Sequence, residues 1–138
     1  MVFIANTTAD LPRIASELLA TTAPARIFTL TGEMGAGKTT FVAAVAAQLG
    51  VTEPTSSPTY SIVQEYVSAD ASVTMLHFDL YRLKTIEEAL DIGIEDLLDR
   101  PDVYIFIEWA DLVLPLLPEN TVHLQISMVE NEARRIAV

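Results

Sequence analysis

The chain reads Gly32-Glu33-Met34-Gly35-Ala36-Gly37-Lys38-Thr39, followed directly by Thr40. This run fits the pattern G-x-x-x-x-G-K-[ST], in which a glycine-rich loop between a strand and a helix holds phosphate groups. The flanking sequence supplies both elements. Residues 26–31, RIFTLT, are rich in β-branched and aromatic side chains and predict a strand. A helix is predicted from Lys38 to about Leu49, with Gly50 as its C-terminal stop.

Each residue type in this loop has a mechanical reason. The glycines at 32, 35 and 37 let the backbone turn tightly and bring amides close to phosphate oxygens, and the helix start adds the positive end of its dipole. Lys38 can reach the β- and γ-phosphates, and the Thr39 hydroxyl can occupy one site on Mg²⁺. Thr40 either approaches the α-phosphate or is an ordinary helix residue. A glycine-rich turn that binds nothing is the alternative, and the agreement of the motif with both flanking elements favours a phosphate site.

Two acids at predicted strand ends are candidates for completing a metal site. Asp79 closes VTMLHFD, and Glu108 follows the apolar run of the next strand. A carboxylate at the end of a buried strand is costly unless it meets a partner or a cation, which favours Glu108 as a site residue. Asp79 could instead cap the following turn or pair with Arg82. His77 is interpreted more simply as a core histidine than as a catalytic base, and Trp109 either packs in the core or senses the nucleotide site.

The remaining patterns predict the architecture. An amphipathic helix is expected over residues 8–22, with Thr8 or Asp10 as its cap and Pro12 in the first turn. An antiparallel strand pair is expected at Ser61–Val67 and Val73–Asp79, followed by a short helix at Thr85–Asp91. A strand buried on both faces is expected at Val103–Trp109, and a C-terminal hairpin at Val122–Val129 with Ala133–Val138. We expect a single domain over residues 1–138: a three-layer P-loop NTPase-like α/β fold with a mixed parallel and antiparallel sheet.

The composition excludes several function classes. Eight Lys and Arg against 19 Asp and Glu give a net charge of −11, which argues against direct nucleic-acid binding because such binding needs basic surfaces. With no cysteine, the chain has neither disulfides nor thiolate chemistry, which fits a reducing compartment. The longest apolar run, residues 41–47, is far shorter than the roughly 20 residues of a membrane span. No leader pattern opens the sequence, so we expect a cytoplasmic protein with no membrane association.

Four segments together resemble one known family. GEMGAGKTT, SSPTYSIVQEY, HFDLYRL and IEWAD, in this order and spacing, are similar to the TsaE (YjeE) family of small bacterial ATPases, and the similarity is strong over residues 26–111. The resemblance implies binding and hydrolysis of ATP with Mg²⁺ in the threonylcarbamoyladenosine modification of tRNA, next to the anticodon. It also implies association with the TsaD and TsaB proteins, whose complex the family is thought to reset between turnovers. Contact with tRNA would then be indirect, through that complex.

The resemblance also assigns roles to individual residues. Residues 32–40 would surround the nucleotide phosphates, with Lys38 catalytic, while Thr39 and Glu108 would ligate Mg²⁺ and Asp79 would assist the metal or the attacking water. Thr59 would belong to a nucleotide-sensing switch, with Trp109 at the site. Weaker similarity suggests that Thr7, in the loop with Asn6, and Asp111 border the nucleotide. Glu33 and Met34 stand where Asp and Leu are common in the family, which are mild substitutions. Asn131 and Arg134 in the C-terminal hairpin carry no assignment.

Two other functions stay open at this stage. A small-molecule kinase would use the same loop, but the stretch from Thr85 to Asp102 has a single Arg among many acids, which is poor chemistry for a phosphate-covering lid. A nucleotide-gated binding module would bind ATP and hydrolyse it only incidentally. The acidic block from Glu87 to Asp102 is either a solvated helix face or a docking surface for a basic partner. The short chain has no evident acceptor domain, which favours an ATPase that a partner protein completes.

Overall fold

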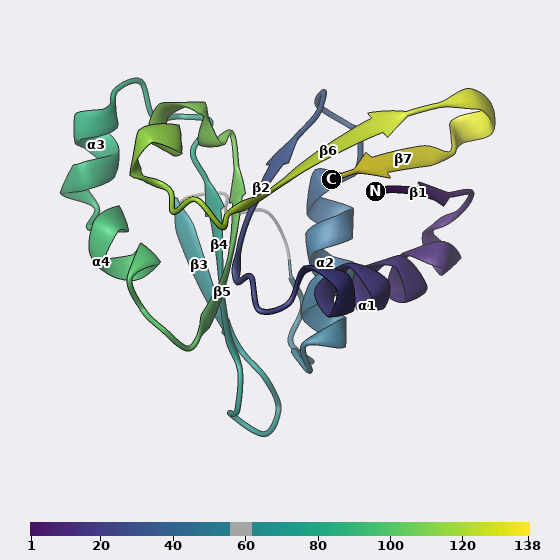
Figure 1. The fold of residues 1–138 in the computed structure, drawn as a ribbon, viewed down its shortest axis with the longest axis horizontal. Coiled ribbons are helices and arrows are strands. Elements are labelled where there is room, and N and C mark those ends of the chain that lie inside the picture. The colour runs from purple at the N-terminus through teal and green to yellow at the C-terminus, as the bar shows by residue number, and fades with distance from the viewer. Residues whose placement is uncertain (56–61) are drawn as a thin grey trace.

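The computed structural model describes residues 1–55 and 62–138. One sheet of seven strands runs through these residues in the order β1-β7-β6-β2-β5-β4-β3 (Figure 1). The strands are β1 (Val2–Ala5), β2 (Ile27–Thr31), β3 (Val63–Val67), β4 (Thr74–Asp79), β5 (Val103–Glu108), β6 (Val122–Met128) and β7 (Arg134–Ala137). The central strands β6, β2, β5 and β4 are parallel, and β3, β7 and β1 add antiparallel edges. The expected mixed sheet is therefore confirmed.

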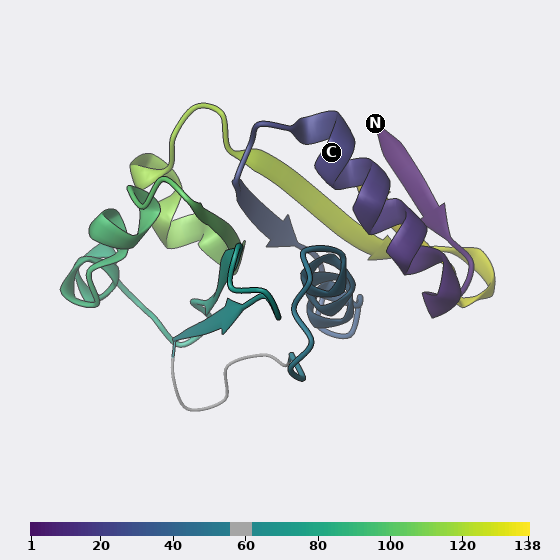
Figure 2. The same cartoon turned by 90° about the horizontal axis from the view of Figure 1, so that it is seen from below.

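Helices cover both faces of this sheet. They are α1 (Leu11–Thr22), α2 (Lys38–Gln48), α3 (Ile86–Asp91) and α4 (Ile94–Leu98), with the 3-10 helices η1 (Thr8–Asp10), η2 (Ala110–Leu116) and η3 (Glu130–Glu132). In Figures 1 and 2, α3, α4 and η2 gather around β3, β4 and β5, whereas α1 and α2 lie beside the other half of the sheet. None of the helices in the described residues is long and apolar enough to cross a membrane.

Two apolar clusters lie between the sheet and the helices, one on each face of the sheet. The first lies between α1, α2 and the sheet, and it contains Phe28 and Phe106, whose rings stack 4.8 Å apart on neighbouring strands. The second lies under α3, α4 and η2 and contains Ile105 and Ile107, from the same strand as Phe106. Because side chains alternate along a strand, β5 contributes to both clusters. This explains its continuous apolar sequence, as the sequence analysis expected for a strand buried on both faces.

The predicted helices and strands are confirmed with small shifts at their ends, whereas β1, α4 and η2 were not predicted and the predicted N-terminal cap is wrong. The sequence analysis did not predict β1, which pairs antiparallel with β7. The cap of the N-terminal helical segment is Thr7, not Thr8 or Asp10 as predicted. The Thr7 side chain accepts from the Ala9 amide at 3.3 Å, and the Asp10 carboxylate accepts from the Asn6 and Thr7 amides, which makes a capping box. The prediction differed because the first turn is the separate 3-10 helix η1, in which Thr7 is the N-cap and Asp10 is the N3 residue of the capping box.

The parallel strands place the candidate residues at one edge. β2 points toward the glycine-rich loop at the top of Figure 1, and β4 and β5 run in the same direction beside it. Asp79 and Glu108 are the last residues of β4 and β5 and are register partners, so they lie side by side on the same face. Ligand sites in open α/β sheets lie at this carboxyl edge, where the strands end.

Candidate active site

The glycine-rich loop, residues 32–39, connects β2 to α2, and its three glycines, at 32, 35 and 37, all have positive φ angles that other residues adopt only with strain. Gly32 has φ +153°, and a Cβ there would lie 2.3 Å from the carbonyl oxygen of Ile126 in β6. Gly37 has φ +102° and is the residue from which α2 begins. These positions let the loop pack against the sheet and turn into the helix in a few residues. The backbone amides at the α2 N-terminus are then available to an anion.

Lys38 is the cation of this loop. Its side chain is buried to 7% exposure and donates a hydrogen bond to the Gly32 carbonyl, which returns the ammonium to the start of the loop. The same ammonium lies 4.5 Å from the centre of the Trp109 ring, within the range of a cation–π contact. Trp109 has φ +58°, directly after β5, and its ring packs 4.9 Å from that of Tyr81. An aromatic pair therefore lies over the cationic end of the loop.

Glu108 is the most buried acid of the site, at 3% exposure. Its Oε2 accepts a hydrogen bond from the Thr39 hydroxyl at 3.4 Å and lies 2.6 Å from Nε2 of His77. Asp79 is half-buried, and its Oδ1 accepts from the Tyr81 amide at 3.1 Å. Asp79 thus caps the turn after β4, one of the alternatives left open by the sequence, while it also stays at the mouth of the site.

These side chains surround a cavity of about 340 Å³, which we call the carboxylate cavity. Its lining combines the loop, the start of α2 and the ends of β4 and β5: Met34, Gly35, Gly37, Lys38, Thr39, Thr40, Asp79, Glu108 and Trp109. The sequence-predicted lysine, hydroxyl, carboxylates and tryptophan are therefore brought together in one place, although they come from segments that are far apart along the chain.

The oxygen donors in the carboxylate cavity fit a hard divalent cation. No group of three or more His, Cys, Asp or Glu residues within the described part of the chain could hold a metal ion by itself. Mg²⁺ does not need such a cage, because it is commonly bound by one or two protein oxygens together with waters and substrate phosphates. The Thr39 hydroxyl and the Glu108 carboxylate, already within 3.4 Å of each other, are two such donors.

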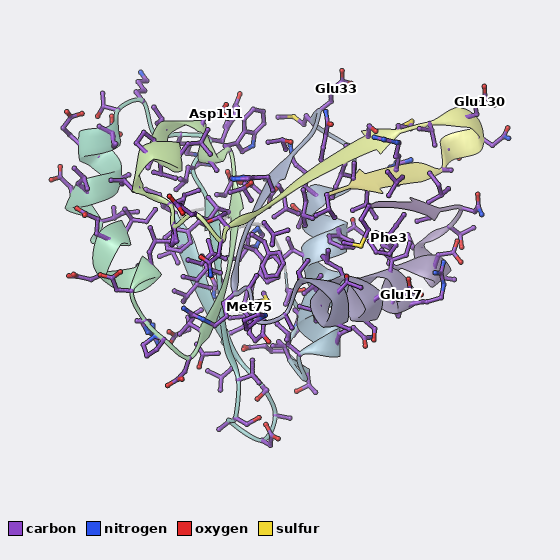
Figure 3. The ribbon with its side chains drawn as sticks, in the orientation of Figure 1. Phe3, Glu17, Glu33, Met75, Asp111 and Glu130 are labelled. Atoms are coloured by element: carbon purple, nitrogen blue, oxygen red, sulfur yellow. The ribbon has the colours of Figure 1, made fainter. Side chains whose placement is uncertain are left out.

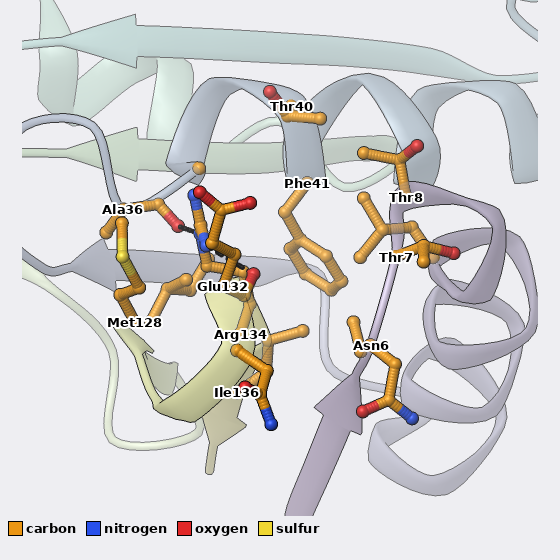
Figure 4. A pocket seen from close by; sticks show the side chains of 15 residues that line it. Asn6, Thr7, Thr8, Ala36, Thr40, Phe41, Met128, Glu132, Arg134 and Ile136 are labelled. Atoms are coloured by element: carbon orange, nitrogen blue, oxygen red, sulfur yellow. Dashed lines mark hydrogen bonds between the residues drawn. The ribbon is translucent and has the colours of Figure 1, made fainter.

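A second, larger cavity of about 550 Å³ lies on the other side of the loop, and we call it the hairpin cavity. Figure 4 shows Arg134 of β7 on one side, Asn6 and Thr7 on the other, and the Phe41 ring between them. Nε of Arg134 donates to the Ala36 carbonyl at 2.8 Å, which ties the C-terminal hairpin to the glycine-rich loop. Gly37 and Thr40 of the loop region line both cavities, so the two are adjacent across the start of α2.

Some predicted residues lie elsewhere. Glu33 and Asp111 are exposed and line neither cavity, and Figure 3 shows both at the periphery of the molecule. Their contact with a nucleotide remains a prediction. Met34 is 77% exposed but lines the carboxylate cavity, and Thr7 lines the hairpin cavity. Thr59, the predicted switch residue, lies outside the described residues.

Two residues lie at the site although the sequence analysis did not place them there. Arg134 was left unassigned because the hairpin carries no local motif, and only the β6–β7 pairing brings it to the loop. His77 was interpreted as a core histidine. It is indeed buried, at 1% exposure, but its partner is the site carboxylate Glu108. The available signal was its alternation with Asp79, since residues two apart on a strand share a face.

The chain is similar to a family of known proteins. The sequence model of a family described as "Threonylcarbamoyl adenosine biosynthesis protein TsaE" matches residues 5–136. Among the relatives, each named tRNA threonylcarbamoyladenosine biosynthesis protein TsaE, the protein of Bacillus subtilis (strain 168) is 34% identical over 113 residues, 82% of this chain and 68% of that protein. The protein of Treponema pallidum (strain Nichols) is 35% identical over 112 residues, 81% of this chain and 80% of that protein.

A solved structure supports the same assignment. The crystal structure of Bacillus subtilis YdiB superposes with a TM-score of 0.75 at 27% identity, covering 99% of this chain and 82% of that one. With the seven-stranded mixed sheet between its helices, this similarity confirms the P-loop NTPase-like α/β fold. The chain belongs to the TsaE family of tRNA threonylcarbamoyladenosine biosynthesis proteins.

Proposed function

We propose that this protein binds ATP with Mg²⁺ and hydrolyses it to sustain the threonylcarbamoyladenosine modification of tRNA. The observation that carries the proposal is the pair of cavities on either side of the glycine-rich loop. One is lined by a lysine, two threonines, two carboxylates and Trp109, and the other is larger and is lined by Phe41 and Arg134. A single nucleoside triphosphate matches this division, with its phosphates in the carboxylate cavity and its nucleoside in the hairpin cavity.

Residues on both sides of the loop have roles in this arrangement. Lys38 leaves the Gly32 carbonyl and binds the β- and γ-phosphates, while the amides of the loop hold the phosphate oxygens. Thr39 and Glu108 would hold Mg²⁺, and the ion would supply positive charge to stabilise the phosphates during transfer. On the other side, Arg134 and Thr7 border the nucleoside.

The reaction would be the attack of water on the γ-phosphorus, with cleavage of the bond to the β–γ bridging oxygen. Asp79 is suited to orient that water, because its backbone position is fixed beside Glu108 and its carboxylate is held by the Tyr81 amide. The leaving group is ADP, and Lys38 would stabilise the negative charge that develops on its β-phosphate. The Trp109 ring lies 4.5 Å from the Lys38 ammonium and so borders the place proposed for the phosphates.

The family resemblance supports the proposal of partner proteins. We propose that the protein acts on a complex of TsaD and TsaB, which carries out the modification, and that it meets tRNA only through that complex. The net charge of −11 supports the indirect contact, because it disfavours an approach to the tRNA backbone. The acidic block from Glu87 to Asp102, which forms α3 and α4, is a candidate surface for the partners.

The test begins with ATP binding by the Lys38→Ala variant, measured by calorimetry. A hydrogen bond to a charged group contributes about 1.5–3 kcal/mol, so affinity should fall by roughly ten- to a hundredfold. Lys84→Ala is the matched control, because Lys84 is exposed and lines neither cavity. Equal affinities for the two variants would contradict the placement of the triphosphate over the loop.

Phosphate release then distinguishes the candidate functions. We expect slow release by the protein alone and faster release with TsaD and TsaB, measured with and without tRNA, whereas equal rates would refute a partner-dependent ATPase. A phosphorylated metabolite in place of inorganic phosphate would indicate a kinase. If Glu108→Ala still binds ATP and the partners but no longer supports modification, hydrolysis is required; if modification persists, the protein is a nucleotide-gated binding module.

A further inference from the structure

His77 and Glu108 form a buried polar pair beneath the carboxylate cavity. The His77 Nε2 lies 2.6 Å from the Glu108 Oε2, and the two side chains are 1% and 4% exposed. His77 is on β4, two residues before Asp79, and its register partner on β5 is Phe106. Since Phe106 and Glu108 lie on the same face of β5, the imidazole lies directly below the carboxylate on the α2 side of the sheet.

The hydrogen bonds of this pair have a defined direction. A carboxylate oxygen only accepts, so His77 Nε2 carries the hydrogen and donates it, as does the Thr39 hydroxyl at 3.4 Å. Both donors meet the same oxygen, Oε2, and together they fix the rotation of the carboxylate about its last bond. Without His77, the Glu108 carboxylate, at 3% exposure, would keep, among the described residues, only the longer bond from Thr39.

Burial of the His77 imidazole is costly, which indicates that its hydrogen bond to Glu108 has a role. Among the described residues, Nδ1 of His77 has no hydrogen-bond partner, so one polar atom of the ring is buried without compensation. An unsatisfied buried polar group destabilises the folded state, because it loses its hydrogen bonds to water without replacement. An apolar side chain at this strand position would avoid that cost and pack in the same core, which contains Met75 and Phe106. What such a side chain could not do is donate a hydrogen bond to Glu108.

We propose that His77 is a positioning residue that holds the Glu108 carboxylate in the orientation required for Mg²⁺, together with Thr39. This inference rests on the proposed function, because it assigns His77 a role in the magnesium site described above. Groups that hydrogen-bond a metal ligand orient it and tune its basicity, and their removal commonly weakens metal binding by 10- to 100-fold. His77 does not line the carboxylate cavity, so we assign it no contact with the phosphates or the attacking water.

The experiment measures the Mg²⁺ dependence of ATP binding rather than turnover. ATP affinity is determined by calorimetry in EDTA and then across a Mg²⁺ series, and the midpoint of the Mg²⁺-dependent gain is compared between variants. For His77→Leu, we expect the midpoint to rise 10- to 100-fold while the affinity in EDTA stays at the wild-type value. His77→Gln should restore a midpoint close to that of the wild type, because its amide nitrogen reaches the place of the ring Nε2.

Two further variants separate positioning from packing. His123→Leu removes a histidine that makes a comparable 2.7 Å bond, to the buried Thr29 hydroxyl. Thr29 pairs with Ile107 and so lies on the opposite face of the sheet from Glu108. This control should lose stability without a change in the Mg²⁺ midpoint. His77→Asn is polar like Gln but one methylene shorter, so it cannot place its amide nitrogen at the position of Nε2.

The outcomes decide whether His77 positions the Glu108 carboxylate or only packs in the core. A wild-type midpoint in His77→Leu would overturn the inference. If that variant does not fold, the Asn and Gln variants decide: a raised midpoint in Asn alone supports positioning, and equal midpoints in the two variants overturn it. Failure of the proposed function is visible separately, since wild-type protein would then show no ATP binding or no gain of affinity with Mg²⁺.

Discussion

The substitution Gly32→Ala tests whether the glycine-rich loop is held against the sheet by close packing. The new Cβ would lie 2.3 Å from the Ile126 carbonyl oxygen, whereas carbon–oxygen contacts lie at about 3.3 Å or more. The loop and β6 would therefore have to separate by about 1 Å. Both are backbone, so neither can move away by a change of side-chain rotamer.

The expected loss of stability has two contributions. A non-glycine residue in the left-handed region costs about 1–2 kcal/mol, and overpacking costs about 1–3 kcal/mol. We therefore expect the free energy of unfolding of Gly32→Ala to fall by about 2–5 kcal/mol, measured by urea denaturation. Gly93→Ala isolates the first contribution, because Gly93 has φ +80° and no atom of the described residues lies within 4 Å of the added Cβ. Its expected loss is about 1–2 kcal/mol.

Gly35→Ala provides the same comparison inside the loop. Gly35 has φ +85° and open space around its Cβ position, so its substitution should cost as much stability as Gly93→Ala. It lines the carboxylate cavity, so it should also weaken ATP binding, which Gly93→Ala should leave unchanged. If Gly32→Ala were no more destabilising than Gly93→Ala, the close approach of the loop to β6 would not be the reason for a glycine at residue 32.

Further predictions concern the core, the N-terminal cap and one exposed acid. Phe106→Ala removes a fully buried ring that stacks on Phe28, and should lower the free energy of unfolding by about 3–5 kcal/mol in urea denaturation. Thr7→Ala removes the side-chain cap of the first helical segment and should cost about 0.5–2 kcal/mol, seen as a lower Tm. Hydrogen bonds from Ser72, first from its hydroxyl and then from its amide, lower the pKa of Asp70 from 3.8 to about 2. Because the pKa is lower in the folded protein, the ionised Asp70 stabilises the folded state above about pH 4, and this contribution is lost as the pH falls through 2. In an NMR titration, Ser72→Ala should raise the pKa of Asp70 toward 3.8.

Much of the fold was predictable because its signals are local. The strand before Gly32 and the helix after Gly37 follow from side-chain type and from glycine punctuation, and both are confirmed. The buried strand β5 was recognisable as a continuous apolar run, and the β3–β4 hairpin by its short polar link. β1 was missed because four residues at a chain end carry too little periodicity to be distinguished from a loop.

Some residues of the candidate site could be identified from the sequence and others could not. Lys38, Thr39 and Glu108 were identifiable from the sequence because a motif or a charge after an apolar run marks each of them. Arg134 and His77 were not, since an arginine in a hairpin and a histidine in a strand have ordinary structural explanations. Their significance depends on which residue lies opposite: the Ala36 carbonyl for Arg134 and the Glu108 carboxylate for His77.

The sequence by itself determined the loop, the class of fold and the family resemblance, because backbone preferences, apolar periodicity and motif spacing are encoded over a few consecutive residues. Only the tertiary structure decided that the loop is flanked by two cavities and that Glu108 is held from below by His77. The physical reason is that hydrogen bonds and cavities depend on distances across the sheet. Strand order and register set these distances, and the sequence patterns alone did not reveal them.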